Sequence, residues 1–162
     1  IYGLPSSGPH SNGFTLIRKL LELEAKDKVS ELKKSLMIAT RLYSDFAQDP
    51  VILNSCSGFA HITGGGIVDN LPRIFSKDLT ARIQLDSWDV PISLKWAIKR
   101  ARLSQNQALQ TFNCGIGFIA VVPLNRSREF EIQSKKINEP VVKIGEIIQG
   151  NQLAFKGKLN ID

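Results

Sequence analysis

The sequence has little of the residue types that build disulfide frameworks and metal centres. Cysteine occurs only twice, at Cys56 and Cys114, and histidine only twice, at His10 and His61. Since the cysteines form no CxxC pair and have no accompanying pair of histidines, neither a disulfide framework nor a zinc site is indicated. We expect both cysteines to be small buried apolar residues, and we predict no metal ligands in this chain.

Long apolar runs are also missing. No stretch approaches the roughly 18 uninterrupted apolar residues that cross a bilayer, and the N-terminus lacks the basic-then-apolar order of a secretion signal. We therefore expect a cytoplasmic protein with no membrane partner. The length of 162 residues and the hydrophobic content of 43% predict one domain over residues 1–162. Because Ile1-Tyr2-Gly3-Leu4 resembles the second half of a strand, we expect this domain to belong to a longer protein.

Acidic residues are fewer than basic ones. The chain has 21 Lys and Arg against 15 Asp and Glu, which gives a net charge of +6 and a pI near 9.5. Such a charge suits a partner that carries phosphate groups. The basic residues are scattered, however, and pairs such as Arg18-Lys19 and Lys33-Lys34 have acidic neighbours, as on solvated helix faces. We therefore predict no nucleic-acid partner.

Apolar residues recur at helical spacing in several segments. They predict helices over about 13–24, 39–48 and 67–74, a helix that follows Pro91, and one helix between 125 and 140. The charged stretch 26–28 is expected to be a turn. Pro50 is expected to help end the helix before it.

Strands are predicted between these helices. Residues 79–86 alternate apolar and polar side chains, which is typical of a half-exposed strand. Residues 115–122 are almost wholly apolar, so we expect a central strand that is buried on both faces. Short apolar runs predict further strands at 59–62, 141–148 and 153–155. The order of elements predicts an α+β fold, a layered α/β sandwich with a mixed sheet covered by helices.

The segment between the first strand and the first helix has the composition of an anion-binding turn. Its sequence is Pro5-Ser6-Ser7-Gly8-Pro9-His10-Ser11-Asn12-Gly13. Glycine lets backbone N–H groups converge on a ligand, Ser and Asn donate hydrogen bonds and cap helices, and a helix N-terminus favours negative charge. This segment predicts a phosphate ligand.

Two further glycine-rich segments carry weaker signals. Gly64-Gly65-Gly66 lies between a predicted strand and a predicted helix, where it is either a phosphate cradle or a plain tight turn. It lacks the Lys-Ser/Thr ending of a P-loop, so no ATP site of that type is expected. The run from Gly115 to Ala120 matches GxGxxG/A in letters, but it opens a strand rather than a helix. We interpret Gly115 and Gly117 as sites of close backbone approach.

Both histidines lie beside these turns. We expect at least one of His10 and His61 to contact a ligand, where an imidazole can donate to a phosphate oxygen or stabilise charge during phosphoryl transfer. Asn113 stands at the mouth of the predicted central strand. Its amide would hold either a loop or a substrate, and of these two roles we favour the structural one.

Three segments in this order carry a family resemblance. They are residues 5–13, then Ala60-His61-Ile62-Thr63-Gly64-Gly65-Gly66 with Asn70-Leu71-Pro72-Arg73, then Thr111-Phe112-Asn113-Cys114-Gly115-Ile116-Gly117. Together they resemble the C-terminal domain of the phosphoribosylformylglycinamidine cyclo-ligase (aminoimidazole ribonucleotide synthetase) family. Thr40-Arg41-Leu42-Tyr43, Trp88 before Pro91, and Lys143-Ile144-Gly145 agree with that family as well. The chain departs from it at Gln107-Ala108-Leu109-Gln110, where a basic residue and an Asp/Glu-Met pair are usual, and at Ala39, where proline is usual.

The resemblance implies ATP-dependent ring closure in purine biosynthesis, which converts formylglycinamidine ribonucleotide to aminoimidazole ribonucleotide. It implies ATP and magnesium, bound mainly through an N-terminal domain beyond this chain, a homodimer of the whole protein, and no turnover by the 162-residue chain alone. His10 is the implied catalytic residue. The implied binding residues are Ser6, Ser7, Gly8, Ser11, Asn12, Gly13, His61, Thr63, Gly64, Gly65, Gly66, Asn70 and Asn113. Two alternatives stay open: a non-catalytic module that binds a phosphorylated ligand, and a related ATP-dependent synthetase of the same superfamily.

Overall fold

A computed structural model describes all of residues 1–162. Four strands form one sheet in the order β2-β4-β1-β5, and every neighbouring pair is antiparallel. The strands are β1 (Tyr2–Pro5), β2 (Gly58–His61), β4 (Ile116–Val121) and β5 (Val142–Lys143). β4 pairs on both sides and is buried over nearly its whole length, so the prediction of a central buried strand is confirmed.

A second sheet has three strands in the order β6-β3-β7. β3 (Leu79–Gln84) pairs antiparallel with β6 (Gly145–Gln149) and parallel with β7 (Ala154–Lys156), so this sheet is mixed. The apolar run predicted as one strand over 141–148 serves both sheets, because the chain changes sheet at the fully buried Ile144. Gly145 permits this change, since a Cβ there would lie 2.2 Å from the carbonyl oxygen of Arg82.

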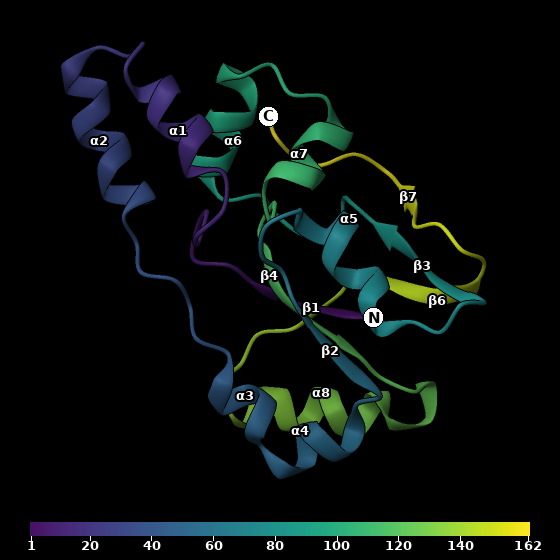
Figure 1. Cartoon of the computed structure of the whole chain (residues 1–162). Helices are drawn as coiled ribbons and strands as arrows, with labels where there is room; N and C mark the ends of the chain where they lie inside the picture. Colours follow the sequence, from purple (N-terminus) through teal and green to yellow (C-terminus); the bar gives the residue numbers. More distant parts are fainter.

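Helices cover these sheets in two groups (Figure 1). α3, α4 and α8 lie together at one end of the molecule, and α1, α2, α6 and α7 lie at the other. The helices are α1 (Phe14–Leu21), α2 (Lys26–Leu36), α3 (Ser44–Gln48), α4 (Pro50–Ser55), α5 (Gly66–Asn70), α6 (Ile92–Arg100), α7 (Gln105–Thr111) and α8 (Ser127–Lys136), with short 3-10 turns η1 (Leu71–Ile74) and η2 (Leu124–Arg126). The α+β class and the layered arrangement predicted from the sequence are confirmed, with the strands divided between two sheets. No helix is long and apolar enough to cross a membrane.

Two expectations between residues 26 and 55 are wrong. The charged stretch 26–28 begins α2 instead of forming a turn; α2 is mostly solvated and buries only Leu36, so its sequence carries little apolar periodicity. The helix expected over 39–48 ends at Gln48 as predicted, but it begins only at Ser44, and Pro50 also starts the next helix, α4. Proline suits the first position of a helix because its missing N–H would have no partner there.

Helix α7 was not predicted at all. Its start is fixed by a capping box, in which the Ser104 hydroxyl accepts from the Gln107 backbone N–H and the Gln107 side chain accepts from the Ser104 N–H at 2.9 Å. Glutamine serves this role as well as glutamate does. The departure from the family pattern at Gln107 therefore keeps the local structure intact.

The two faces of the four-stranded sheet belong to different hydrophobic clusters. Ile119 of β4 packs in the larger cluster with residues of β3, α1, α5, α6 and α7. Phe118 and Ala120 point the other way, into a smaller cluster with Phe46 and Phe130 from the α3, α4 and α8 group. Cys114 is buried as expected, Cys56 is half-buried, and burial raises the pKa of both thiols to about 12.

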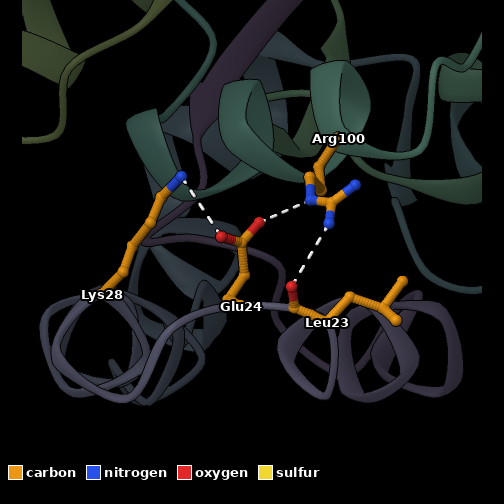
Figure 2. A network of polar contacts seen from close by, with 4 residues as sticks. All are labelled: Leu23, Glu24, Lys28 and Arg100. Atoms are coloured by element: carbon orange, nitrogen blue, oxygen red, sulfur yellow. Dashed lines mark hydrogen bonds and ion pairs between the residues drawn. The ribbon is translucent and has the colours of Figure 1, made fainter.

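A polar network ties the α1–α2 connection to α6 (Figure 2). The Glu24 carboxylate accepts from the Arg100 Nε at 2.6 Å and lies 3.3 Å from the Lys28 Nζ. The Arg100 guanidinium also donates to the Leu23 carbonyl oxygen. The hydrogen bond from Arg100 lowers the pKa of Glu24, which keeps the carboxylate charged and the contact intact at neutral pH. The network holds the end of α1 against α6.

We predict that Asp49→Ala lowers the free energy of unfolding by about 0.5–2 kcal/mol at neutral pH, the usual range for a lost N-cap. Asp49 Oδ1 accepts from the backbone N–H groups of Val51 and Ile52 at 3.0 and 2.9 Å, and these bonds lower the pKa of its carboxyl. A lowered folded-state pKa stabilises the fold at higher pH, and this contribution disappears as the pH falls through that pKa. Urea unfolding of both proteins at pH 7 and under acid conditions measures the difference.

Asp49→Asn is the matched control, because asparagine caps as well as aspartate does but carries no charge. It should keep most of the neutral-pH stability and lose the pH dependence. An Asp49→Ala difference that stayed constant into acid would contradict this account.

Candidate functional site

The pairing of β4 brings the three predicted loops to one edge of the sheet. β1 and β2 both run antiparallel to β4, so the ends of β1 and β2 lie beside the start of β4. Pro5 pairs with Ile116, and His61 pairs with Phe118. The loop after β1 (6–13), the loop after β2 (62–66) and the segment before β4 (111–115) therefore leave the sheet next to one another. The structure brings together the residues that the sequence analysis grouped.

Asn113 fastens the first of these loops to the third. Its Oδ1 accepts from the Ser6 hydroxyl at 3.0 Å and from the Gly115 N–H at 2.9 Å, and its Nδ2 donates to the Gly8 carbonyl oxygen at 2.8 Å. Asn113 is only 1% exposed. Of the two roles that the sequence left open, these contacts favour holding the loop.

The first loop is packed tightly where it enters α1. Gly13 has φ 70°, and a Cβ there would lie 2.2 Å from Cε1 of Phe112. Only glycine fits both the backbone conformation and the space. Asn12 beside it is buried, and its Nδ2 has no hydrogen-bond partner. Ser11 is exposed, and Ser6 and Ser7 are half-buried. The Ser11 hydroxyl and the Asn12 amide therefore have donors without a partner in the chain, whereas the hydroxyls of Ser6 and Ser7 already donate to Asn113 and to the Ala39 carbonyl oxygen.

His10 is held in one tautomer by the loop itself. Its Nε2 accepts from the Ser7 backbone N–H at 3.1 Å, so in the neutral ring the proton is on Nδ1. Nδ1 is buried without a partner, and the residue is 7% exposed. Burial, followed by the charges of His61 and Arg41, lowers the pKa of His10. A neutral imidazole with a free N–H donor suits contact with an acceptor oxygen.

Tyr43 stands between the two histidines. Its ring centroid is 6.1 Å from that of His10 and 6.0 Å from that of His61, and its hydroxyl donates to the Pro5 carbonyl oxygen at 2.8 Å. Gly117 makes room for this arrangement, since a Cβ there would lie 2.1 Å from the Tyr43 hydroxyl and 2.6 Å from Cε1 of His10. The prediction that Gly117 is a site of close approach is confirmed; Gly115 is another, with φ 102° and a Cβ position 2.8 Å from the Asp89 carbonyl oxygen.

The second loop is organised by Asn70. Its Nδ2 donates to the carbonyl oxygens of Gly64 and Gly66 at 3.0 and 2.8 Å, and its Oδ1 accepts from the Thr63 hydroxyl at 3.2 Å. Gly65 and Gly66 have positive φ, and a Cβ on Gly66 would lie 1.9 Å from the Leu109 carbonyl oxygen of α7. Gly64, by contrast, faces open space. The loop therefore has a fixed inner side and a free outer side.

Sequence reasoning did not place Arg41 or Tyr43 in the site. Both lie in the extended segment between α2 and α3, which runs beside the first loop, and Ser7 donates to the Ala39 carbonyl oxygen at 2.8 Å. Their only sequence signal was the Thr40–Tyr43 motif, used for the resemblance. No spacing rule connects residues 41 and 43 with residue 10, so only the fold shows that they meet.

The three loops of the site do not line two sizeable hollows of the domain. The hollows of about 540 and 600 Å³ are lined by other residues, one around Tyr2 and Lys143 and one between α1 and α2 around Phe14. No group of three or more His, Cys, Asp or Glu side chains is placed to hold a metal ion. The donors gathered here are hydroxyl, amide, imidazole and backbone N–H groups, which suit phosphate rather than a cation.

The fold of the chain is similar to that of one half of solved thiamine-monophosphate kinases. The thiamine-monophosphate kinase of Stenotrophomonas maltophilia matches with a TM-score of 0.59 and 14% identity, over 97% of this chain and 50% of that one. The structure of AaThiL complexed with AMPPCP and TMP matches with a TM-score of 0.56 and 14% identity, over 98% and 48%. At this identity the likeness defines the fold alone.

Residues 1–158 match the family described as "AIR synthase related protein, C-terminal domain", and the chain belongs to that family. It is 39% identical to the phosphoribosylformylglycinamidine cyclo-ligase, chloroplastic/mitochondrial, of Vigna unguiculata, over 96% of this chain and 42% of the relative. It is also 39% identical to the phosphoribosylformylglycinamidine cyclo-ligase of Citrifermentans bemidjiense, over 91% and 44%. The chain thus spans less than half the length of these relatives, and the resemblance found in the sequence is confirmed.

We predict that Gly117→Ala destabilises the fold by about 1–3 kcal/mol, the usual cost of overpacking, because the added methyl group displaces Tyr43 and His10. Gly64→Ala is the matched control, since nothing lies within 4 Å of its Cβ position. Urea unfolding should show a change of less than about 0.5 kcal/mol for that variant, as at ordinary surface positions. Equal effects of the two substitutions would refute the packing at Gly117.

We predict that His10 titrates below its ordinary pKa of 6.5 in the folded protein. The pKa of His10 is lower in the folded protein than in the unfolded chain, so as the pH falls through 6.5 the unfolded chain binds a proton before the folded protein does. The fold therefore loses stability as the pH falls through 6.5 and below. NMR titration of the imidazole C–H resonances measures the pKa. His61→Asn should raise the pKa of His10, since the charge of His61 contributes to lowering it. A His10 pKa at or above 6.5 would contradict the burial argument.

Proposed function

We propose that this chain is the C-terminal domain of an ATP-dependent cyclo-ligase that forms aminoimidazole ribonucleotide. The observation that carries the proposal is the meeting of three donor-rich loops at one sheet edge, in a chain whose relatives at 36–39% identity are phosphoribosylformylglycinamidine cyclo-ligases. Since the chain spans 42–47% of those relatives, the rest of the active site would come from an N-terminal domain.

The proposed reaction has two steps. The formyl oxygen of formylglycinamidine ribonucleotide attacks the γ-phosphorus of ATP, and ADP leaves. An amidine nitrogen then attacks the activated carbon, the ring closes, and phosphate leaves with the former formyl oxygen. Phosphoryl transfer depends on positioning and on stabilisation of charge on oxygen, so N–H and O–H donors are what such a site requires.

His10 is the proposed catalytic residue, because the contact of Nε2 with Ser7 places the proton on Nδ1, and this buried N–H has no partner in the chain and would donate to a phosphoryl oxygen. The exposed Ser11 and the outer side of Gly64 would contact the ligand, while the N–H and O–H of Ser7 already donate to His10 and to the Ala39 carbonyl oxygen. ATP and the ribonucleotide are the proposed ligands. Magnesium would be held mainly by the N-terminal domain, since this chain offers no carboxylate cluster. A homodimer of the whole protein and a cytoplasmic location stay predictions.

Two alternatives use the same loops. A non-catalytic module would bind a phosphorylated ligand without turnover, and a related ATP-dependent synthetase would act on another substrate. The names of the relatives favour the cyclo-ligase over both. A signal of ligand binding with no ring closure would favour the binding module.

The test uses a chimera in which residues 1–162 replace the C-terminal domain of the Citrifermentans bemidjiense relative. We predict that this chimera catalyses ATP-dependent ring closure. Neither part should turn over alone. His10→Ala in this chimera should lower kcat by roughly 100- to 1000-fold, the usual effect of removing one donor to developing negative charge. The assay follows aminoimidazole ribonucleotide and ADP together.

Lys99→Ala is the control, because Lys99 is exposed in the last turn of α6 and is not part of the three loops. It should leave kcat unchanged. A folded chimera that binds ATP but releases neither product would contradict the cyclo-ligase function, and an unchanged rate for His10→Ala would remove His10 from catalysis.

A further inference from the structure

The three loops of the site carry no permanent positive charge. Residues 1–17, 58–70 and 111–117 contain neither lysine nor arginine. His10 is buried with a lowered pKa, so it contributes no charge at neutral pH. A phosphate group bound here would have only neutral donors around it. A bound phosphoryl dianion is normally met by a cation as well, so a cation from another segment is to be expected.

Arg41 is the cation that reaches the first loop. Its Nη1 donates to the Pro5 carbonyl oxygen at 3.2 Å, immediately before Ser6. Its charge is near enough to His10 to lower the pKa of that residue. Its Cζ lies 5.4 Å from the centroid of the Tyr43 ring. The guanidinium therefore lies at the base of the first loop, near His10 and Tyr43.

The guanidinium is held in place but keeps free donors. The Arg41 side chain is 24% exposed, pairs through Nη2 with the Glu139 carboxylate, and donates through Nη1 to the Pro5 carbonyl oxygen. A guanidinium has five N–H donors, and these contacts use only part of them. Glu139 follows α8, so the ion pair connects Arg41 to a segment outside the three loops. A fixed planar fork with unused N–H groups is the usual form of an arginine that binds phosphate.

We propose that Arg41 is a phosphate-binding residue of this site, which donates from its free N–H groups to a phosphate group held against the loop of residues 6–13. The inference rests on the proposed function for the identity of the ligand, a phosphate monoester or anhydride. The binding of a phosphate group by Arg41 does not depend on the proposed function. The carboxylate of Glu139 orients the guanidinium and, through its own charge, limits how strongly the site attracts an anion.

The test measures binding to the 162-residue chain by calorimetry, with three separate probes. Inorganic phosphate tests the bare group, AMPPCP tests the nucleotide as its source, and formylglycinamidine ribonucleotide tests the substrate as its source. Arg41→Met should weaken binding of at least one probe by about 10- to 100-fold, as expected for loss of a hydrogen bond to a charged group. Arg41→Lys keeps the positive charge but not the planar fork of N–H donors. Its affinity should therefore lie between that of the original chain and that of Arg41→Met.

Glu139→Gln should change the affinity for the probes in the direction opposite to Arg41→Met. The glutamine oxygen can still accept from Nη2, while the negative charge beside the anion is removed, so affinity should rise by about two- to fivefold at low salt. A purely structural ion pair would not produce this increase. Arg82→Met and Glu146→Gln are the matched controls, because Arg82 and Glu146 form an ion pair at 2.8 Å in the other sheet. Neither should change the affinity for any probe.

Urea unfolding of each variant separates binding from folding. The proposal is overturned if Arg41→Met binds every probe as tightly as the original chain, or if the original chain binds none of them at millimolar concentration. If Arg41→Met fails to fold, Arg41→Lys and Glu139→Gln still decide the matter, since unchanged affinity in both overturns it. Arginine-dependent binding together with an inactive chimera would keep this inference and reject the cyclo-ligase function.

Discussion

The position of β4 between β1 and β2 is the constraint on which the site depends. Because both neighbours run antiparallel to β4, they run parallel to each other although they do not pair, and both end at the edge where β4 begins. Three loops that are about 50 residues apart in the sequence therefore meet without any direct signal between them. Burial of β4 in two hydrophobic clusters fixes this register, since a slip of one residue would exchange Phe118 with Ile119 between the two clusters.

Close contact at two glycines converts this meeting of loops into a defined geometry. Gly117 lets the Tyr43 hydroxyl and the His10 ring approach the strand, and Gly13 lets the first loop lie against Phe112. Asn113 then joins the first loop to the third through two hydrogen bonds, with Ser6 and Gly8, and Asn70 bonds to the backbone within the second loop. Two buried asparagines thus fix the loop backbones, which leaves hydroxyl and N–H groups of other residues for a ligand.

Much of the fold could be predicted from local pattern, and the failures have physical causes. Strong alternation or continuous apolar runs predicted β3 and β4, because burial on one or two faces leaves that pattern. Helix α2 was not predicted because a largely solvated helix carries little periodicity of apolar residues. Helix α7 was not predicted because its start depends on a capping box at Ser104 rather than on apolar residues. In the site, the loops could be found from composition. The proximity of Arg41 and Tyr43 to them could not, since it results from the path of residues 37–43 across the domain.

The distribution of charge explains how a basic chain can carry a neutral set of ligand loops. The net charge of +6 lies mainly on solvated helices such as α2 and α6, where Glu24 already engages Arg100 and Lys28. Neutral loops can be packed against buried aromatic rings without the cost of desolvating a charge. A guanidinium could not take the place of His10, which is buried; it can stand at the base of the loop, where Arg41 is partly solvated and paired with Glu139. The division between buried neutral donors and a half-exposed cation therefore follows from the low polarity of the surface on which the loops are built.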